Sequence, residues 1–277
     1  MIGLFTFKTL RTRFFVLLLI PVCILLIIGG ISSFIYTRNA MLEQWNEGAI
    51  LKLERAAHFM EMRLTAPLKM LDSLFQARSS LSPYEVLTAL HAQKGVVYAE
   101  YRHIGTPLRF GHGNMMQKRM HFQRSGIEGI SKPSFNADIG RETLTVTVNL
   151  WDDTQSPIST LNIVMGFDYL LEDMVRLSWW QSNMACIVDK EGRYLAHTNM
   201  SMTGRQRLGG NGDPLEASIL GRMKSHTYGT VKSEGHPPKM IAGFYKLTQA
   251  PWTIVIYAKG KTVLEPIITY RNGFVFG

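Results

Sequence analysis

The chain has 277 residues, of which 46% are hydrophobic and 18% are charged, and its formal net charge is +9 at pH 7. This composition excludes a mainly disordered chain and a coiled coil, and the length allows one large domain or two of ordinary size. The chain carries 30 Lys and Arg against 21 Asp and Glu, and without Lys8, Arg11, Arg13 and Arg271 the balance is 26 against 21. The basic residues form no concentrated stripe, so we expect no nucleic-acid partner.

An apolar segment follows the basic N-terminus. Phe14 to Ile35 contains no charged residue, and as a helix it would be about 33 Å long, enough to cross a hydrocarbon core of roughly 30 Å. The positive-inside rule then predicts residues 1–13 in the cytoplasm, residues 14–35 in the membrane and the body of the chain outside the cytoplasm. A cleaved signal peptide is the alternative, but the run is longer than a usual signal and residues 32–36 form a poor cleavage site.

Residues 36–81 are expected to form one long stalk helix that continues from the membrane segment. Apolar residues recur there at steps of three or four, which is the spacing of one helix face. They are Leu42, Trp45, Ala49, Leu53, Ala56, Met60, Leu64, Leu68 and Leu71. From Arg38 to Gln76 this helix would span about 58 Å, with a kink or a break at Pro67. The stripe fits a core helix packed on its own domain; we also expect it to pair with a second subunit, which predicts a homodimer through the long helix.

Residues 82–178 are expected to form a first α+β unit. Ser82-Pro83-Tyr84-Glu85 has the order of a capping box with proline at the first helical position. Apolar and polar residues alternate strictly from Thr143 to Leu150, as a half-buried strand requires. The other expected elements are a strand over 96–102, a helix over 115–124, a returning strand over 161–167, and a helix over 169–178 that Asp168 caps.

Residues 179–262 are expected to form a second unit of the same kind. Asp189-Lys190-Glu191-Gly192 separates two short apolar runs, which indicates a hairpin. Asp213-Pro214-Leu215-Glu216 has the same pattern as residues 82–85, a capping residue followed by proline and then by Glu at the third position, and predicts the start of another helix. Three strands over 228–233, 240–246 and 252–258 complete the unit. The chain turns apolar again over 263–277, which we interpret as the start of a second, truncated membrane helix. The fold class is therefore α+β: a transmembrane helix, a long stalk helix and two tandem PAS-like units with antiparallel sheets.

At this point the chain resembles the double Cache (dCache) extracytoplasmic sensor domains of bacterial transmembrane receptors. Three stretches carry the resemblance: 132–140 with the strand that follows it, 163–171, and 186–192 together with 252–255. The resemblance covers residues 36 to about 265. It implies an inner-membrane protein whose residues 36–265 are extracytoplasmic, with residues 82–178 as the membrane-distal Cache unit and 179–262 as the proximal one.

The resemblance also implies a small-ligand site in the distal unit. The candidate residues are Arg119, Asp168, His121, Phe122, Asn136, Ser134 and Tyr101. Family members that bind amino acids hold the carboxylate with an Arg and the amine with Asp residues, and Arg119 and Asp168 match two of these positions. Asn136 stands where the family has an Asp and Ser134 where it has a Tyr, which weakens an ammonium site, so a carboxylate-containing ligand is favoured.

Each candidate also has a structural interpretation. Arg119 fits an exposed residue, Asp168 a helix cap, and His121 and Phe122 core or surface positions. Tyr101 can point at the ligand pocket or at the core.

Other chemistries find little support. His103, His112 and His121 recur every nine residues, which matches no helix or strand face, so we expect no metal site. No nucleophile elbow and no His-Glu-x-x-His motif occurs, so we expect neither an enzyme nor a cofactor in this segment. The sequence predicts a small-ligand sensor that signals to a cytoplasmic output, most simply a histidine kinase. A chemoreceptor or a diguanylate cyclase is the alternative output, and a partner-binding anchor or a membrane-anchored periplasmic hydrolase is the alternative class.

Overall fold

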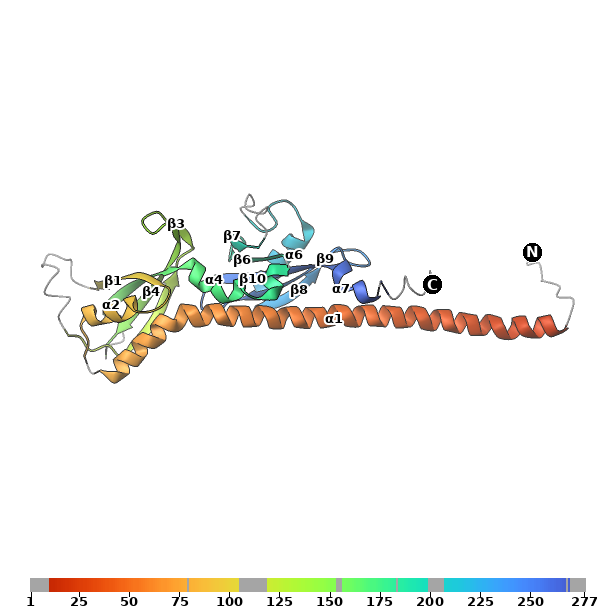
Figure 1. Ribbon diagram of the computed structural model, residues 1–277, viewed down its shortest axis with the longest axis horizontal. Helices are drawn as coiled ribbons and strands as arrows, with labels where there is room; N and C mark the ends of the chain where they lie inside the picture. The colour runs from red at the N-terminus through yellow and green to blue at the C-terminus, as the bar shows by residue number, and fades with distance from the viewer. Residues whose placement is uncertain are drawn as a thin grey trace.

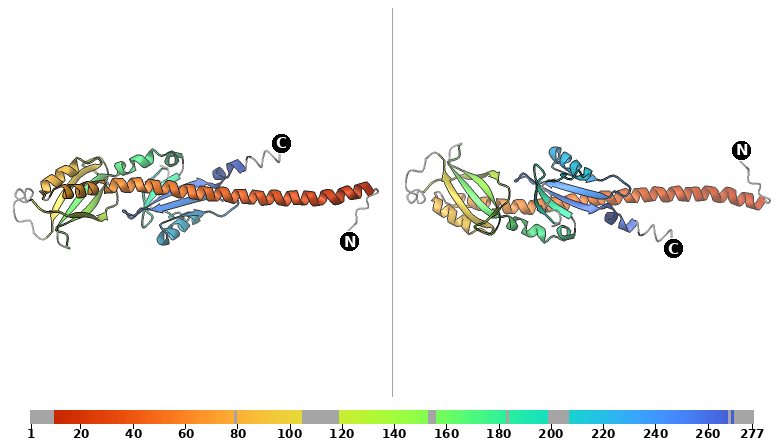
Figure 2. Two further views of the ribbon diagram at one scale, coloured as in Figure 1. Left: turned by 90° about the horizontal axis from the view of Figure 1, so that it is seen from below. Right: turned by 90° about the horizontal axis from the view of Figure 1, so that it is seen from above.

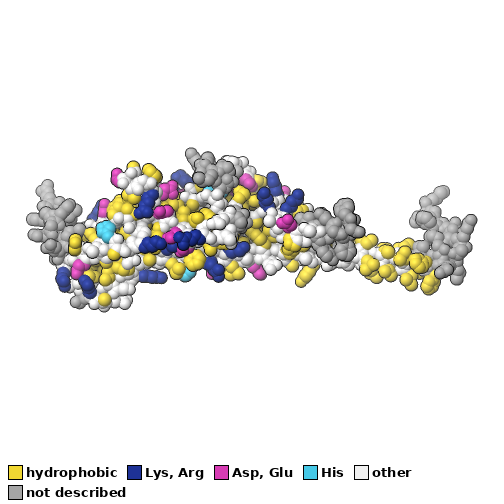
Figure 3. Space-filling view, in the orientation of Figure 1, with side chains coloured by type: hydrophobic (Ala, Val, Ile, Leu, Met, Phe, Trp, Pro, Cys, Tyr) yellow, Lys and Arg dark blue, Asp and Glu magenta, His cyan; other side chains and the backbone are white. Residues whose placement is uncertain are grey.

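The computed structural model describes residues 10–78, 80–104, 119–152, 156–182, 184–198, 207–267 and 269. One helix, α1 (Leu10–Ala77), runs the full length of the molecule and carries two α+β units side by side along its C-terminal half (Figure 1). The apolar side chains from Phe14 to Ile35 are exposed wherever they are described, and they form a bare apolar rod at one end of the molecule (Figure 3). This helix is long and apolar enough to cross a membrane.

Helix α1 continues without a break from the apolar rod into the stalk, as its sequence predicts. Pro67 lies inside the helix, and α1 bends towards its C-terminal end (Figure 1), so the expected disturbance is a kink and not a break. The predicted stripe is buried from Ala49 to Leu71 and belongs to one core that reaches into both units. The stripe is therefore the core face of the helix.

The first sheet has the strand order β1-β5-β4-β2, with β3 also paired to β4, and every pairing is antiparallel. Its elements are α2 (Pro83–His91), β1 (Val96–His103), β2 (Arg124–Ile130), β3 (Ser134–Asn136), β4 (Arg141–Trp151), β5 (Ser159–Gly166) and α4 (Phe167–Val175). The predicted alternation in β4 is confirmed: Leu144, Val146, Val148 and Leu150 are buried, and the residues between them are half-buried. The apolar face packs against α1 and α2, so this sheet has one buried face (Figure 2).

The second sheet has the order β7-β6-β10-β9-β8. Its elements are α5 (Ser178–Ser182), β6 (Met184–Asp189), β7 (Tyr194–His197), α6 (Pro214–Ser225), β8 (Tyr228–Lys232), β9 (Met240–Lys246), β10 (Trp252–Lys259) and α7 (Gly260–Val263). Helix α1 approaches β9 closely, because a Cβ added to Gly243 would lie 3.3 Å from Leu53 and 3.4 Å from Ala49. Helix α6 covers the opposite face with a second core. Both faces are therefore covered, which is why β10 is buried almost throughout and does not alternate.

Side chains from both units also meet directly. The Phe167 ring at the start of α4 meets the Trp252 ring edge-on, with centroids 6.0 Å apart. Lys132, between β2 and β3, reaches Asp189 of the second unit with Nζ 2.6 Å from Oδ2. The units are thus joined to each other as well as to α1.

Two sequence expectations need correction. The expected helix over 115–124 lies outside the described residues up to 118, and the remainder is not helical, with Arg124 beginning β2. The capping box at Ser82 and the cap at Asp213 are confirmed, but Asp168 is not a cap. Gly166 is the N-cap of α4 and offers no side-chain hydrogen bond, so Asp168 lies in the first turn of the helix. Of residues 263–277, where a second membrane helix is expected to begin, the structure describes only 263–267 and 269, so this expectation stays a prediction.

Candidate ligand-binding site

A cavity of about 660 Å³ lies where β5 ends and α4 begins. Its lining residues are Lys94, Gly95, Val96, Arg141, Asp168, Tyr169, Leu171, Glu172, Val175 and Arg176. The volume lies within the roughly 300–1,000 Å³ of small-molecule sites. The lining combines three cations, two carboxylates and an apolar wall, which suits a small polar ligand that carries an anionic group.

Asp168 and Arg141 face each other at this cavity. Arg141 opens strand β4, and its Nη1 lies 3.4 Å from Oδ2 of Asp168. The side chains are 44% and 64% exposed, so solvent weakens this ion pair and the partners remain accessible to a ligand. The first turn of α4 favours the Asp168 carboxylate through the partial positive charge of the helix N-terminus.

Glu172 occupies the next turn of the same helix and gathers three cations. Lys94 Nζ lies 2.9 Å from its Oε2, Arg63 Nη1 lies 3.0 Å from the same oxygen, and Arg176 Nη2 lies 3.0 Å from Oε1. The hydrogen bonds from Lys94 and Arg63 lower the pKa of the Glu172 carboxyl to about 2. Glu172 therefore stays ionised and holds the cavity wall to the stalk.

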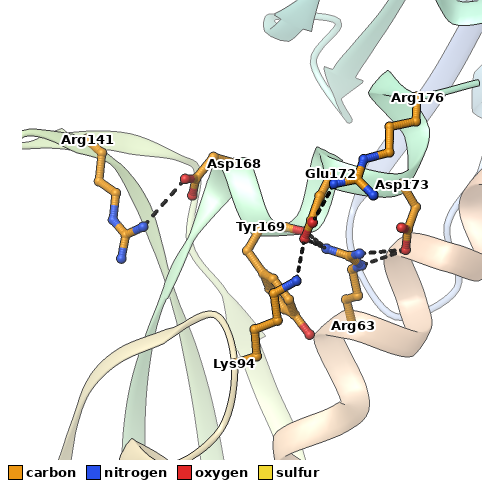
Figure 4. Close-up of polar contacts among 8 residues, drawn as sticks. All are labelled: Arg63, Lys94, Arg141, Asp168, Tyr169, Glu172, Asp173 and Arg176. Carbon is orange, nitrogen blue, oxygen red and sulfur yellow. Dashed lines mark hydrogen bonds and ion pairs between the residues drawn. The ribbon is translucent and has the colours of Figure 1, made fainter.

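Arg63 on α1 contacts several residues of α4 (Figure 4). Besides Glu172, its guanidinium meets Oδ2 of Asp173 at 2.6 Å and donates a hydrogen bond to the backbone oxygen of Tyr169. The guanidinium carbon also lies 4.5 Å from the centroid of the Tyr169 ring, within cation–π range. Four contacts from one arginine tie the first turns of α4 to the middle of the stalk helix.

The Tyr169 ring fits closely over the backbone of Gly95, just before β1. Gly95 has φ +87°, and a Cβ added there would lie 2.1 Å from Cδ1 of Tyr169. The Gly95 carbonyl accepts a hydrogen bond from the Gly166 N–H at 3.0 Å. Only glycine adopts this positive φ without strain and leaves room for the Tyr169 ring. Gly95 therefore fixes how α4 packs against the start of β1.

Of the sequence-predicted site residues, Asp168 lines the cavity, and Asn136 and Ser134 do not. Asn136 pairs in register with Arg141, the partner of Asp168, and its Oδ1 accepts a hydrogen bond from the Asp138 N–H at 3.0 Å. Ser134 is exposed at the start of β3. Of the two predicted residues on β3, only Asn136 is linked to Asp168, through their common neighbour Arg141.

The remaining predicted residues lie elsewhere. Arg119 is exposed and precedes Met120, which pairs with Leu81 beside the start of α2, and Arg119 does not line the cavity that contains Asp168. Tyr101 shares a register rung with the buried Leu161, so it points towards the α1 side of the sheet.

His121 is exposed, whereas Phe122 is buried with its ring centroid 5.3 Å from that of Phe75 on α1. Among the described residues, no group of three or more His, Cys, Asp or Glu side chains is placed to hold a metal ion. His112 lies outside the described residues.

Sequence reasoning missed the polar residues Arg63, Lys94, Arg141, Tyr169, Glu172 and Arg176 at this site. The spacing of Glu172 and Arg176, four residues apart on one helix, is the one signal that could have indicated a pair. Arg63 sits among the apolar positions of the stalk helix, and only the packing of α4 on α1 supplies its partners. Such contacts between distant segments leave no local pattern.

No family model matches the chain, and no curated protein matches it in sequence. Solved structures do match in fold. The sensory domain of the Campylobacter jejuni chemoreceptor Tlp3, solved with isoleucine bound, aligns with a TM-score of 0.54 at 10% identity, covering 82% of this chain and 98% of that domain. The extracellular domain of the histidine kinase rpHK1S-Z16, itself described as putative, aligns with a TM-score of 0.51 at 13% identity, covering 81% and 97%.

The periplasmic sensory domain of the C. jejuni chemoreceptor Tlp1 aligns with a TM-score of 0.52 at 10% identity, covering 82% and 99%. The chain therefore has the fold of extracytoplasmic sensory domains of chemoreceptors and histidine kinases. This is the fold that the resemblance to double Cache domains predicts.

Proposed function

We propose that this chain is the extracytoplasmic small-ligand sensing region of a membrane signal transducer. One observation carries the proposal. Helix α4 forms a wall of the cavity at the β5–α4 junction, and Arg63 holds α4 to α1, the helix whose N-terminal part is the apolar rod. A ligand that shifts α4 would act directly on α1. Such a ligand changes the population of two arrangements of α4 and α1 to the extent that it binds one better than the other.

The proposed ligand is small and contains a carboxylate. Arg141 and Lys94 supply cations at the cavity, and Asp168 supplies an acceptor for an amine or hydroxyl group. Tlp3, which shares the fold, has been solved with isoleucine and with L-valine, both of which are amino acids. The resemblance to double Cache domains assigns the carboxylate to Arg119 instead, so Arg141 and Arg119 are alternative anchors that one experiment can separate.

In this proposal residues 14–35 cross the bacterial inner membrane and residues 36–265 lie outside the cytoplasm. Residues 82–178 form the distal unit, 179–262 the proximal unit, and 263–277 lead back to the membrane. The output is a cytoplasmic module, and the similarity to histidine kinase and chemoreceptor domains supports either a kinase or a chemoreceptor signalling region. A diguanylate cyclase is the third option.

We also propose that two copies pair along α1. Leu51 on α1 is 65% exposed and lines a groove of about 890 Å³ between α1 and residues of the second unit that include Trp179 and Tyr245. Leu51→Cys, in a chain with Cys23→Ser, should crosslink two copies in the membrane. Lys232→Cys, on the exposed edge strand β8, is the matched position that should not crosslink.

The test of ligand binding is a thermal-shift screen of the full chain in neutral detergent against carboxylates, amino acids and amines. A ligand at 100 times its dissociation constant should stabilise the native state by about 2.7 kcal/mol. A hit lost in Arg141→Ala but kept in Arg119→Ala assigns the anchor to the cavity at α4, and the reverse result assigns it to Arg119. A blank across the panel favours a partner-binding anchor, and turnover of a compound would favour a hydrolase.

A further inference from the structure

A second cavity, of about 420 Å³, lies in the proximal unit between α6, the β6–β7 turn and the β9–β10 turn. Its lining residues are Lys190, Glu191, Arg207, Leu220, Met223, Lys224, Lys246, Leu247, Ala250, Pro251, Trp252 and Thr253. It shares no lining residue with the cavity at α4. Its volume also falls within the range of small-molecule sites.

The charge of this cavity is one-sided. Of the described residues that line it, four are cations (Lys190, Arg207, Lys224 and Lys246) and one, Glu191, is acidic. The Glu191 carboxylate lies 3.1 Å from Nζ of Lys132 on the distal unit and 3.7 Å from Nζ of Lys190, so it neutralises at most part of the positive charge at the cavity. Four cations around one cavity raise the local concentration of anions and favour an anionic ligand.

Apart from Thr253, the rest of the lining is apolar. Leu220 and Met223 come from α6, while Leu247 and Pro251 come from the turn that joins β9 to β10, and Trp252 begins β10. Trp252 is 1% exposed, so the cavity ends on the core of the unit. An apolar wall beside cations selects a ligand that has both an apolar body and an anionic group.

We propose that the proximal unit binds a small organic anion with an apolar body in this cavity, as a second site separate from the distal one. The site lies beside the contacts between the two units. Trp252 meets Phe167 at the start of α4, and Lys132 pairs with Asp189 next to Lys190. A bound anion would therefore contact the residues that join the proximal unit to the distal unit.

The test is isothermal titration of the full chain in dodecyl maltoside micelles with phenyl phosphate, benzoate and benzenesulfonate. These probes share a ring and differ in the anionic group; benzyl alcohol serves as the neutral probe and inorganic phosphate as the probe without a ring. We expect at least one aromatic anion to bind at least about tenfold more tightly than either control probe, a difference of about 1.4 kcal/mol.

The variant K224Q/K246Q should weaken that binding by at least about tenfold, because it removes two of the four cations. The matched control is Lys232→Gln, which removes an exposed charge from the same unit outside the cavity and should change the affinity less than about twofold. An unchanged melting temperature of K224Q/K246Q checks that the unit is still folded. Arg141→Ala and Arg119→Ala should leave binding intact, which separates this site from the distal one.

Three results would overturn the proposal. The first is no heat from any of the three anions at about 10 mM, a concentration that detects a dissociation constant near 1 mM. The second is an equal loss of affinity in K224Q/K246Q and Lys232→Gln, which would mean that net charge alone attracts the probes. The third is loss of binding in either distal variant, which would place the probes in the distal unit.

Discussion

Replacing Arg63 with alanine should weaken the attachment of α4 to the stalk helix. The Arg63 side chain is 13% exposed, while its partners Glu172 and Asp173 are 28% and 41% exposed. Exposed ion pairs contribute about 0–1 kcal/mol, and breaking a buried pair costs about 3–5 kcal/mol. Because Arg63 is mostly shielded from solvent and its two acidic partners are partly solvated, Arg63→Ala should cost about 2 kcal/mol, which for a unit of roughly 100 residues lowers the melting temperature by about 8–16 °C.

The assay is thermal unfolding of the full chain in neutral detergent, followed by tryptophan fluorescence. Arg176→Ala is the matched control, because Arg176 also pairs with Glu172 but is 73% exposed; it should cost less than about 1 kcal/mol. Arg63→Lys should fall between the two, since a lysine keeps the charge but cannot form the forked contact. Equal melting temperatures for Arg63→Ala and Arg176→Ala would refute the reasoning that Arg63 joins the two helices.

Three further predictions concern stability. The pKa of Glu172 is lowered to about 2 in the folded chain from an ordinary 4.5, so its stabilising contribution is complete above pH 4.5 and is lost as the pH falls towards 2; Glu172→Gln should flatten the urea-unfolding free energy across that window, and an unchanged pH profile would contradict the assignment. Gly95→Ala should destabilise by at least about 1 kcal/mol, because φ is +87° and the new Cβ would collide with Tyr169, whereas Gly129→Ala, with open space around it, should change the melting temperature little. Leu64→Ala should cost about 2–5 kcal/mol by urea unfolding, because Leu64 is fully buried on the core face of α1; a cost under about 1 kcal/mol would contradict that placement.

Several elements followed from local sequence patterns alone. The capping box at Ser82, the cap at Asp213 and the alternation along β4 each depend on residues a few positions apart. Such short-range patterns satisfy backbone donors or bury one face of a strand whatever the rest of the chain does. Strand β2 was missed because it contains two glycines and a bulge and has only half-buried apolar residues.

The candidate site was less accessible to sequence reasoning. Asp168 was singled out through the resemblance, and it does line a cavity. Its partner Arg141 lies 27 residues earlier in the chain, and Arg63 lies 110 residues before Asp173. These separations carry no periodic signal, because the side chains meet only after β4 pairs with β5 and α4 packs on α1.

The sequence by itself determined the long apolar and amphipathic helix, the α+β class and the two units. Each of these follows from the spacing of apolar residues a few positions apart in the chain. Only the tertiary structure decided that both faces of the second sheet are covered and which cations converge. In that sheet α6 buries the face that α1 does not, and the cations of the proximal cavity come from segments between Lys190 and Lys246. Charges spread along a chain become a site only when backbone hydrogen bonding and core packing bring their segments together.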